Sequence, residues 1–124
     1  MKLEEIPKST EEVRKFSNGD ILLTLWFNGS HCKSMEVVFD MLSGTSVLFC
    51  TNKKSHYYDA ENEVRYGYEL SNVASKCKRV PQNKLETLKI SIRHLNKTIR
   101  GLVHDFLQTV EITKSKVGDL IYIL

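Results

Sequence analysis

The side chains that could do chemistry in this sequence are few and widely separated. His31 and Cys32 are adjacent, while Cys50, His56 and Cys77 stand alone. A zinc site needs pairs of ligands at short spacing, and the sequence has no such pair. A nucleophilic cysteine needs a histidine within hydrogen-bond reach, which distant positions in one sequence cannot establish. We therefore expect no metal and no cofactor, and we expect Cys50, which follows an apolar run, to be a small core residue.

Motifs for other catalytic chemistry are also missing. The sequence has no P-loop, no glycine-rich dinucleotide fingerprint and no Gly-x-Ser-x-Gly elbow. Acids occur in local groups such as Glu61 and Glu63, for which a solvated loop is a simpler interpretation than two carboxyls with separated pKa values. We expect no enzymatic activity, and a small enzyme without a local motif is the last of three alternatives.

Basic residues are concentrated in one segment. The net charge of the chain is only +3, which by itself indicates neither a nucleic acid nor a membrane. Between residues 76 and 100, however, eight basic residues stand against the single acid Glu86. Excluding Lys84, these residues are the candidate contacts to phosphates or to an acidic partner: Lys76, Lys78, Arg79, Lys89, Arg93, Lys97 and Arg100.

Residues 85–107 contain two hydrophobic spacings at once. Leu88, Ile90 and Ile92 alternate with polar residues as in a strand, whereas steps of three and four predict a helix. The helical spacing accounts for more of the apolar residues, so we predict a helix over 83–111, with a strand as the alternative for 88–92 only. The apolar seam of this helix consists of Leu85, Leu88, Ile92, Leu95, Ile99, Leu102 and Phe106.

Both faces of the predicted helix have a structural and a functional interpretation. The apolar seam could cover the sheet of its own domain, which we favour, or pair with a second copy or a partner helix. Lys89, Arg93, Lys97, Arg100 and His104 are spaced 4, 4, 3 and 4, and form a basic stripe beside the seam. Such a stripe is either a solvated helix face or a contact surface for phosphates or an acidic segment.

The remaining elements must build a sheet for this helix to cover. Ser9 to Glu12 has the pattern of a capping box and predicts a short helix over 10–17. Asn28-Gly29 favours a tight hairpin. Strands are predicted at 20–27, 33–42, 45–51, 63–70 and 117–124, with a loop at 52–62.

The predicted fold is therefore α+β, within a single domain spanning 1–124. It has an antiparallel meander of four to five strands, a short N-terminal helix and one long C-terminal helix packed on a face. This order of elements resembles that of RWD-like domains, which mostly act as docking modules in larger assemblies. The Tyr-Pro motif common in those domains is absent, and Pro81 does not follow a tyrosine.

These features lead to an expectation about function. We expect a non-catalytic protein-interaction domain that binds a protein partner in a larger assembly or forms a homodimer. The alternative is a nucleic-acid-binding module that uses the basic stripe. No run is apolar enough to span a membrane, the N-terminus lacks the pattern of a signal peptide, and the odd cysteine count suits reduced thiols. We therefore expect an intracellular protein, cytoplasmic or nuclear.

Overall fold

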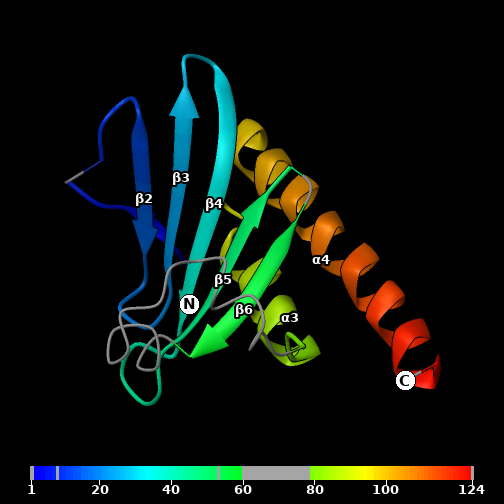
Figure 1. Cartoon of the computed structure of the whole chain (residues 1–124). Helices are drawn as coiled ribbons and strands as arrows, with labels where there is room; N and C mark the ends of the chain where they lie inside the picture. Colours follow the sequence, from blue (N-terminus) through cyan, green and yellow to red (C-terminus); the bar gives the residue numbers. More distant parts are fainter. Residues whose placement is uncertain (1, 8, 53, 60–78, 124) are drawn as a thin grey trace.

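A computed structural model describes residues 2–7, 9–52, 54–59 and 79–123, with the side chains of the last helix as far as Val110. Within these residues the chain is α+β, with six strands followed by two helices (Figure 1). The predicted strand over 63–70 lies outside the described residues.

The sheet is an antiparallel meander in which each strand pairs with its neighbours in the sequence. Short turns produce this order because they connect only antiparallel neighbours. Within the described residues it has six strands, where the sequence predicted four or five. The strands are β1 (Glu4–Glu5), β2 (Val13–Ser17), β3 (Leu22–Asn28), β4 (His31–Phe39), β5 (Ser46–Thr51) and β6 (Ser55–Asp59).

Three central strands, β3, β4 and β5, lie close to their predicted ranges. Gly29 has a φ of +62° in the β3–β4 turn, a left-handed conformation that glycine adopts without a Cβ clash. Just before this turn the register between β3 and β4 shifts at Trp26/Phe27. Such an irregularity bends a strand and redirects the side chains beside it.

The short helix predicted over 10–17 is wrong, because this segment forms β2. The hydroxyl groups of Ser9 and Thr10 do not cap a helix. They accept hydrogen bonds from backbone N–H groups along one edge of β2. Ser9 Oγ accepts a hydrogen bond from Lys15 N at 2.7 Å, and Thr10 Oγ1 accepts one from Val13 N at 3.1 Å. On its other side β2 pairs with β3 from Val13 to Ser17. The order of elements on which the resemblance to RWD-like domains rested is therefore changed at its start.

The loop predicted over 52–62 is also wrong in part, because β6 forms there. Tyr57 and Tyr58 lie in this strand opposite Leu48 and Val47 of β5, and both tyrosines are buried. Their burial on the two faces of the sheet stabilises a strand in a segment that is otherwise polar.

The single helix predicted over 83–111 is two helices, α3 (Gln82–Ser91) and α4 (Lys97–Ile123). The strand alternative for 88–92 is overturned by α3. The break arises because the side chain of Asn96 starts a new helix: its Oδ1 accepts a hydrogen bond from Ile99 N at 2.9 Å. At the other end, Pro81 is the N-cap residue of α3, and no side chain makes a capping hydrogen bond there.

The strand predicted over 117–124 is wrong as well, because α4 continues to Ile123. Once a helix is initiated and packed, each added residue gains a local hydrogen bond. A final strand would need a turn and a partner, while Gly118 inside the helix costs only about 1 kcal/mol relative to alanine.

The core lies between one face of the sheet and the two helices, which cover the same side (Figure 1). Leu23, Leu25, Met35, Val37 and Leu48 contribute from the strands and are fully buried. On the opposite face Val47 and Tyr58 form a small second cluster with Val38.

Candidate functional site

The predicted apolar seam belongs to the core of its own chain. Five of its members are buried, and the other two, Leu95 and Leu102, are partly buried against the same core. The buried members are Leu85, Leu88, Ile92, Ile99 and Phe106. In this structure the seam packs on the sheet, which is the interpretation that the sequence favoured.

The predicted basic residues do not form one straight stripe, because the helix breaks between Ser91 and Lys97. Arg79 is exposed just before α3, and Lys76 and Lys78 lie outside the described residues. The other basic residues surround the junction of the two helices, where no acid occurs between Glu86 and Asp105. We call this surface the basic corner: Lys89, Arg93, His94, Lys97, Arg100 and His104.

The basic corner places cations at the amino end of α4, where a helix favours negative charge. Lys97 is the first residue of α4, Arg100 lies one turn later, and the first turn contains no acid. The amino end of a helix carries a partial positive charge, so each cation near it destabilises the helix by about 0.3–1 kcal/mol at low salt. Lys89 has the opposite relation to α3, because it lies in the last turn, where a cation is favourable. The helix dipole therefore does not explain the cations on α4.

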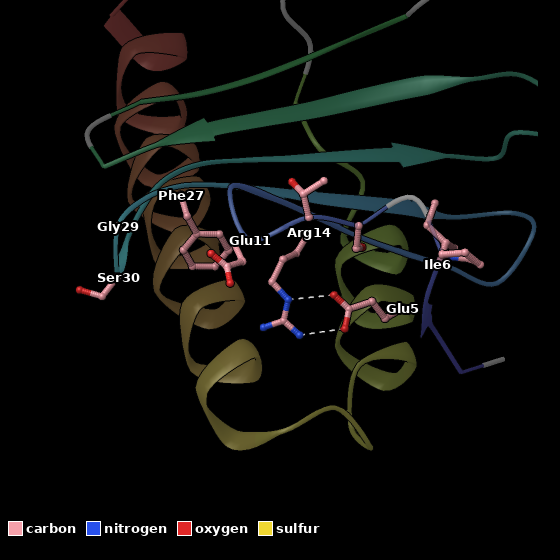
Figure 2. A pocket seen from close by; sticks show the side chains of 10 residues that line it. Glu5, Ile6, Glu11, Arg14, Phe27, Gly29 and Ser30 are labelled. Atoms are coloured by element: carbon pink, nitrogen blue, oxygen red, sulfur yellow. Dashed lines mark hydrogen bonds and ion pairs between the residues drawn. The ribbon is translucent and has the colours of Figure 1, made fainter.

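Two hollows meet at the β3–β4 turn. The first, of about 890 Å³, lies between the N-terminal segment and this turn, and has Ile6 and Phe27 in its lining (Figure 2). The second, of about 380 Å³, lies between the turn and α4, and has Leu102 and Phe106 in its lining. Ser30 lines both hollows and is exposed. We call the combined surface the hairpin groove.

The hairpin groove has a partly apolar floor and a polar rim. Phe27 and Leu102 come from different elements, and both are partly buried against the core. The rim includes the exposed acids Glu11 and Asp105. Half-buried apolar side chains surrounded by polar groups are typical of surfaces that bind a polypeptide.

An ion pair crosses the first hollow, with its two side chains pointing toward each other (Figure 2). Arg14 donates from Nε to Glu5 Oε2 at 2.8 Å and from Nη2 to Glu5 Oε1 at 2.9 Å. These hydrogen bonds lower the pKa of Glu5 despite the opposing effect of burial. The pair is about one-third exposed, so its contribution to stability is at most about 1 kcal/mol. It fixes the position of the β1 segment relative to β2.

A second polar cluster joins α3 to the sheet, and the sequence analysis did not find it. Lys84 Nζ lies 2.7 Å from Asp40 Oδ2 and donates to Ser46 Oγ at 3.0 Å and to Tyr57 Oη at 2.9 Å. Tyr57 in turn donates to Ser46 Oγ at 2.9 Å. We call these four residues the Lys84 cluster. They come from four separate elements or turns, so no local spacing could have indicated them.

The Lys84 cluster connects α3 to the sheet and does not activate a nucleophile. A lysine that acts as a general base must lose its proton near neutral pH. Burial acts to lower the pKa of Lys84, but its hydrogen bonds to Asp40 and Tyr57 outweigh burial and hold the pKa above the usual value. The amine is therefore charged, and Ser46, which is buried, is not activated by it.

Cys32 and Cys50 are free, buried thiols. Burial raises the pKa of Cys32 and raises that of Cys50 to about 12. Because the thiolate is the reactive form, both cysteines are poor nucleophiles in the folded chain. The placement of Cys50 in the core confirms the expectation from the sequence.

The rate of alkylation measures how reactive the Cys32 and Cys50 thiols are in the folded chain. In a Cys77→Ser background we expect Cys50 to resist iodoacetamide at pH 8, since a pKa of about 12 leaves roughly one thiol in ten thousand ionised. Cys32 should react faster than Cys50, and both should react fully in denaturant. Peptide mass spectrometry at successive times measures the rates. Modification of Cys50 in the native protein as fast as in denaturant would contradict this assignment.

Within the part of the chain that the structure describes, no three His, Cys, Asp or Glu side chains are grouped so that they could hold a metal ion. Among the same residues, no helix combines the length and the apolar character that crossing a membrane requires. Comparison of this chain with protein-family models, curated proteins and solved structures finds no match in any of the three.

Proposed function

We propose that this chain is a non-catalytic protein-interaction domain that binds a polypeptide segment of its partner in the hairpin groove. One observation carries the proposal: Phe27 and Leu102 remain only partly covered beside the two hollows that meet at Ser30. The partner's segment would cover these side chains with an apolar residue, and basic residues beside it would face Glu11 and Asp105.

The charge states of Lys84 and of the two buried thiols support a binding role over catalysis. Lys84 is held in its charged form, and the Cys32 and Cys50 thiols are held in their neutral form. Free thiols also suit a reducing compartment, so we place the domain inside the cell, in the cytoplasm or nucleus. It would act in a larger assembly or as a homodimer, with the groove of one copy receiving a segment of the other.

The experiment that tests this proposal compares two exposed serines at opposite ends of β4. A photo-crosslinking residue is placed at Ser30 or at Ser43 of the full chain in the source cell, and the adducts are identified by mass spectrometry. We expect an adduct specific to Ser30, whose mass distinguishes a second copy of this chain from another protein. Equal adducts at the two positions, or none at Ser30, would contradict the proposal.

The protein captured at Ser30 is then purified and its affinity is measured with two matched variants. Ser30→Arg places a long cation where both hollows meet, and should weaken binding at least about 10-fold, or 1.4 kcal/mol. Ser43→Arg adds the same side chain in the exposed β4–β5 turn and should leave the affinity unchanged. Equal effects of the two variants would remove the groove from the interface.

A further inference from the structure

The basic corner is fixed in place by apolar residues while its charges remain outside. Ile92 is fully buried in the turn after α3, and Ile99 is 2% exposed in the first turn of α4. Between and beside them Arg93, His94 and Lys97 are exposed. The buried isoleucines therefore attach both sides of the turn to the core.

The two cations and a histidine of the corner on α4 lie along one side of the helix. Lys97, Arg100 and His104 are three and four residues apart, which places them on a common face over about 10 Å of helix axis. Arg100 Nε is buried and has no hydrogen-bond partner in the described part of the chain. This guanidinium is thus not held through Nε by a neighbouring carboxylate.

Along the sequence no acid lies between Glu86 and Asp105, while in space Leu3 N donates to Ser91 O at 3.0 Å and brings Glu4 beside the junction. Glu86 precedes Lys89 by one turn of α3 and accepts a hydrogen bond from Gln82 at 2.9 Å. Asp105 lies beyond the corner and lines the hairpin groove. Cations gathered at the positive end of a helix repel one another and the helix dipole, and a bound anion would convert that repulsion into attraction.

We propose that the basic corner binds the phosphate backbone of a nucleic-acid duplex without reading its sequence. A duplex presents about six phosphate charges along 10 Å of its axis, enough for Lys89, Arg93, Lys97 and Arg100 to contact together. The segment from 79 to 105 contains no Phe, Tyr or Trp, so this segment itself supplies none of the stacking side chains with which proteins hold single strands. A lipid surface is less suited, because Ile90 is the only large apolar side chain that this part of the described structure exposes.

Fluorescence anisotropy with a labelled 20-base-pair DNA duplex tests the proposal on the full chain. Four phosphate contacts predict that affinity falls about 100-fold between 50 and 200 mM salt. A double variant, Arg93→Gln with Lys97→Gln, should weaken binding at 50 mM salt and reduce this fall to about 10-fold, because two contacts are lost. Both residues are exposed, so the thermal unfolding midpoint should show that the variant is folded.

A matched double variant removes the same net charge elsewhere. Lys33 and Lys54 are exposed on β4 and before β6, and changing both to Gln should leave the salt dependence as in the unmodified chain. Undetectable binding at 20 mM salt, or equal effects of the two double variants, would overturn the proposal. So would binding to phosphatidylserine vesicles or an acidic peptide without binding to the duplex. Ser30→Arg should retain duplex binding, which separates failure of this proposal from failure of the hairpin groove.

Discussion

Truncation of Leu88 to alanine is expected to lower the free energy of unfolding by about 2–5 kcal/mol, whereas the same truncation of Ile90 should cost less than about 1 kcal/mol. Leu88 is fully buried between α3 and the sheet, while Ile90 is 52% exposed on the same helix. The large cost at Leu88 combines the lost burial of its side chain with the cavity left behind. The two positions lie two residues apart, so the comparison also distinguishes a helix from a strand.

Urea denaturation followed by circular dichroism measures both free energies on otherwise identical chains. In a strand, Leu88 and Ile90 would point to the same face and would be affected alike. In α3 they differ by two helical positions and lie on nearly opposite sides. Comparable losses at the two positions would therefore be inconsistent with α3, and with the packing that holds the basic corner in place.

Replacement of Lys84 by methionine is expected to destabilise the chain by about 1–3 kcal/mol, because several hydrogen bonds to a charged amine are lost at once. The methionine keeps most of the apolar length of the side chain but loses the ammonium, whose Nζ lies 5.8 Å from the centroid of the Phe39 ring and 5.6 Å from that of Tyr57. Asp40 is 38% exposed and regains water when its partner is removed, which limits the cost. Lys33→Met removes an exposed lysine and should change stability by less than about 0.5 kcal/mol.

A double-mutant cycle separates the Lys84 cluster from simple loss of a lysine. Lys84→Met and Tyr57→Phe remove two partners that are 2.9 Å apart, so their effects should not add, with a coupling energy of about 0.5–3 kcal/mol. Effects that add to within about 0.3 kcal/mol would show that Tyr57 and Lys84 act independently.

The contribution of Lys84 to the stability of the fold should decrease at high pH. The pKa of Lys84 is raised in the folded chain above its usual value of 10.5. Its contribution is therefore complete below pH 10.5 and is lost as the pH rises through the folded pKa. The stability difference between the unmodified chain and Lys84→Met should be the same at pH 7 and pH 9 and smaller above pH 11. Urea denaturation at these pH values measures it, and a difference that grows above pH 11 would contradict the charged form of Lys84.

Local patterns were sufficient for the central sheet and for the side of the helices that is buried. Apolar runs and the Asn28-Gly29 turn predicted β3, β4 and β5, because strand and turn preferences act between near neighbours. The spacing of the apolar seam also predicted which side chains of α3 and α4 face inward, since a helix repeats every 3.6 residues.

Local patterns misassigned elements whose backbone groups have more than one available partner. Ser9 and Thr10 have the composition of a helix cap, but their hydroxyls satisfy β2, whose other edge is paired with β3. Asn96 looks like an interior residue of one long helix, yet its side chain caps α4. In both cases the deciding partner is a backbone group, and a pattern of side-chain types does not specify which one is available.

By itself, the sequence determined an antiparallel α+β arrangement, an inward apolar seam and a concentration of positive charge between residues 76 and 100. Only the tertiary structure decided that Lys84, one of these basic residues, contacts Asp40, Ser46 and Tyr57. It also decided that the hairpin groove forms where the N-terminal segment, the β3–β4 turn and α4 come together. Periodicity is a property of neighbouring residues and can be read along a chain. A contact between residues dozens of positions apart depends on the register of the sheet and on where α3 and α4 turn, which are consequences of the folded backbone as a whole.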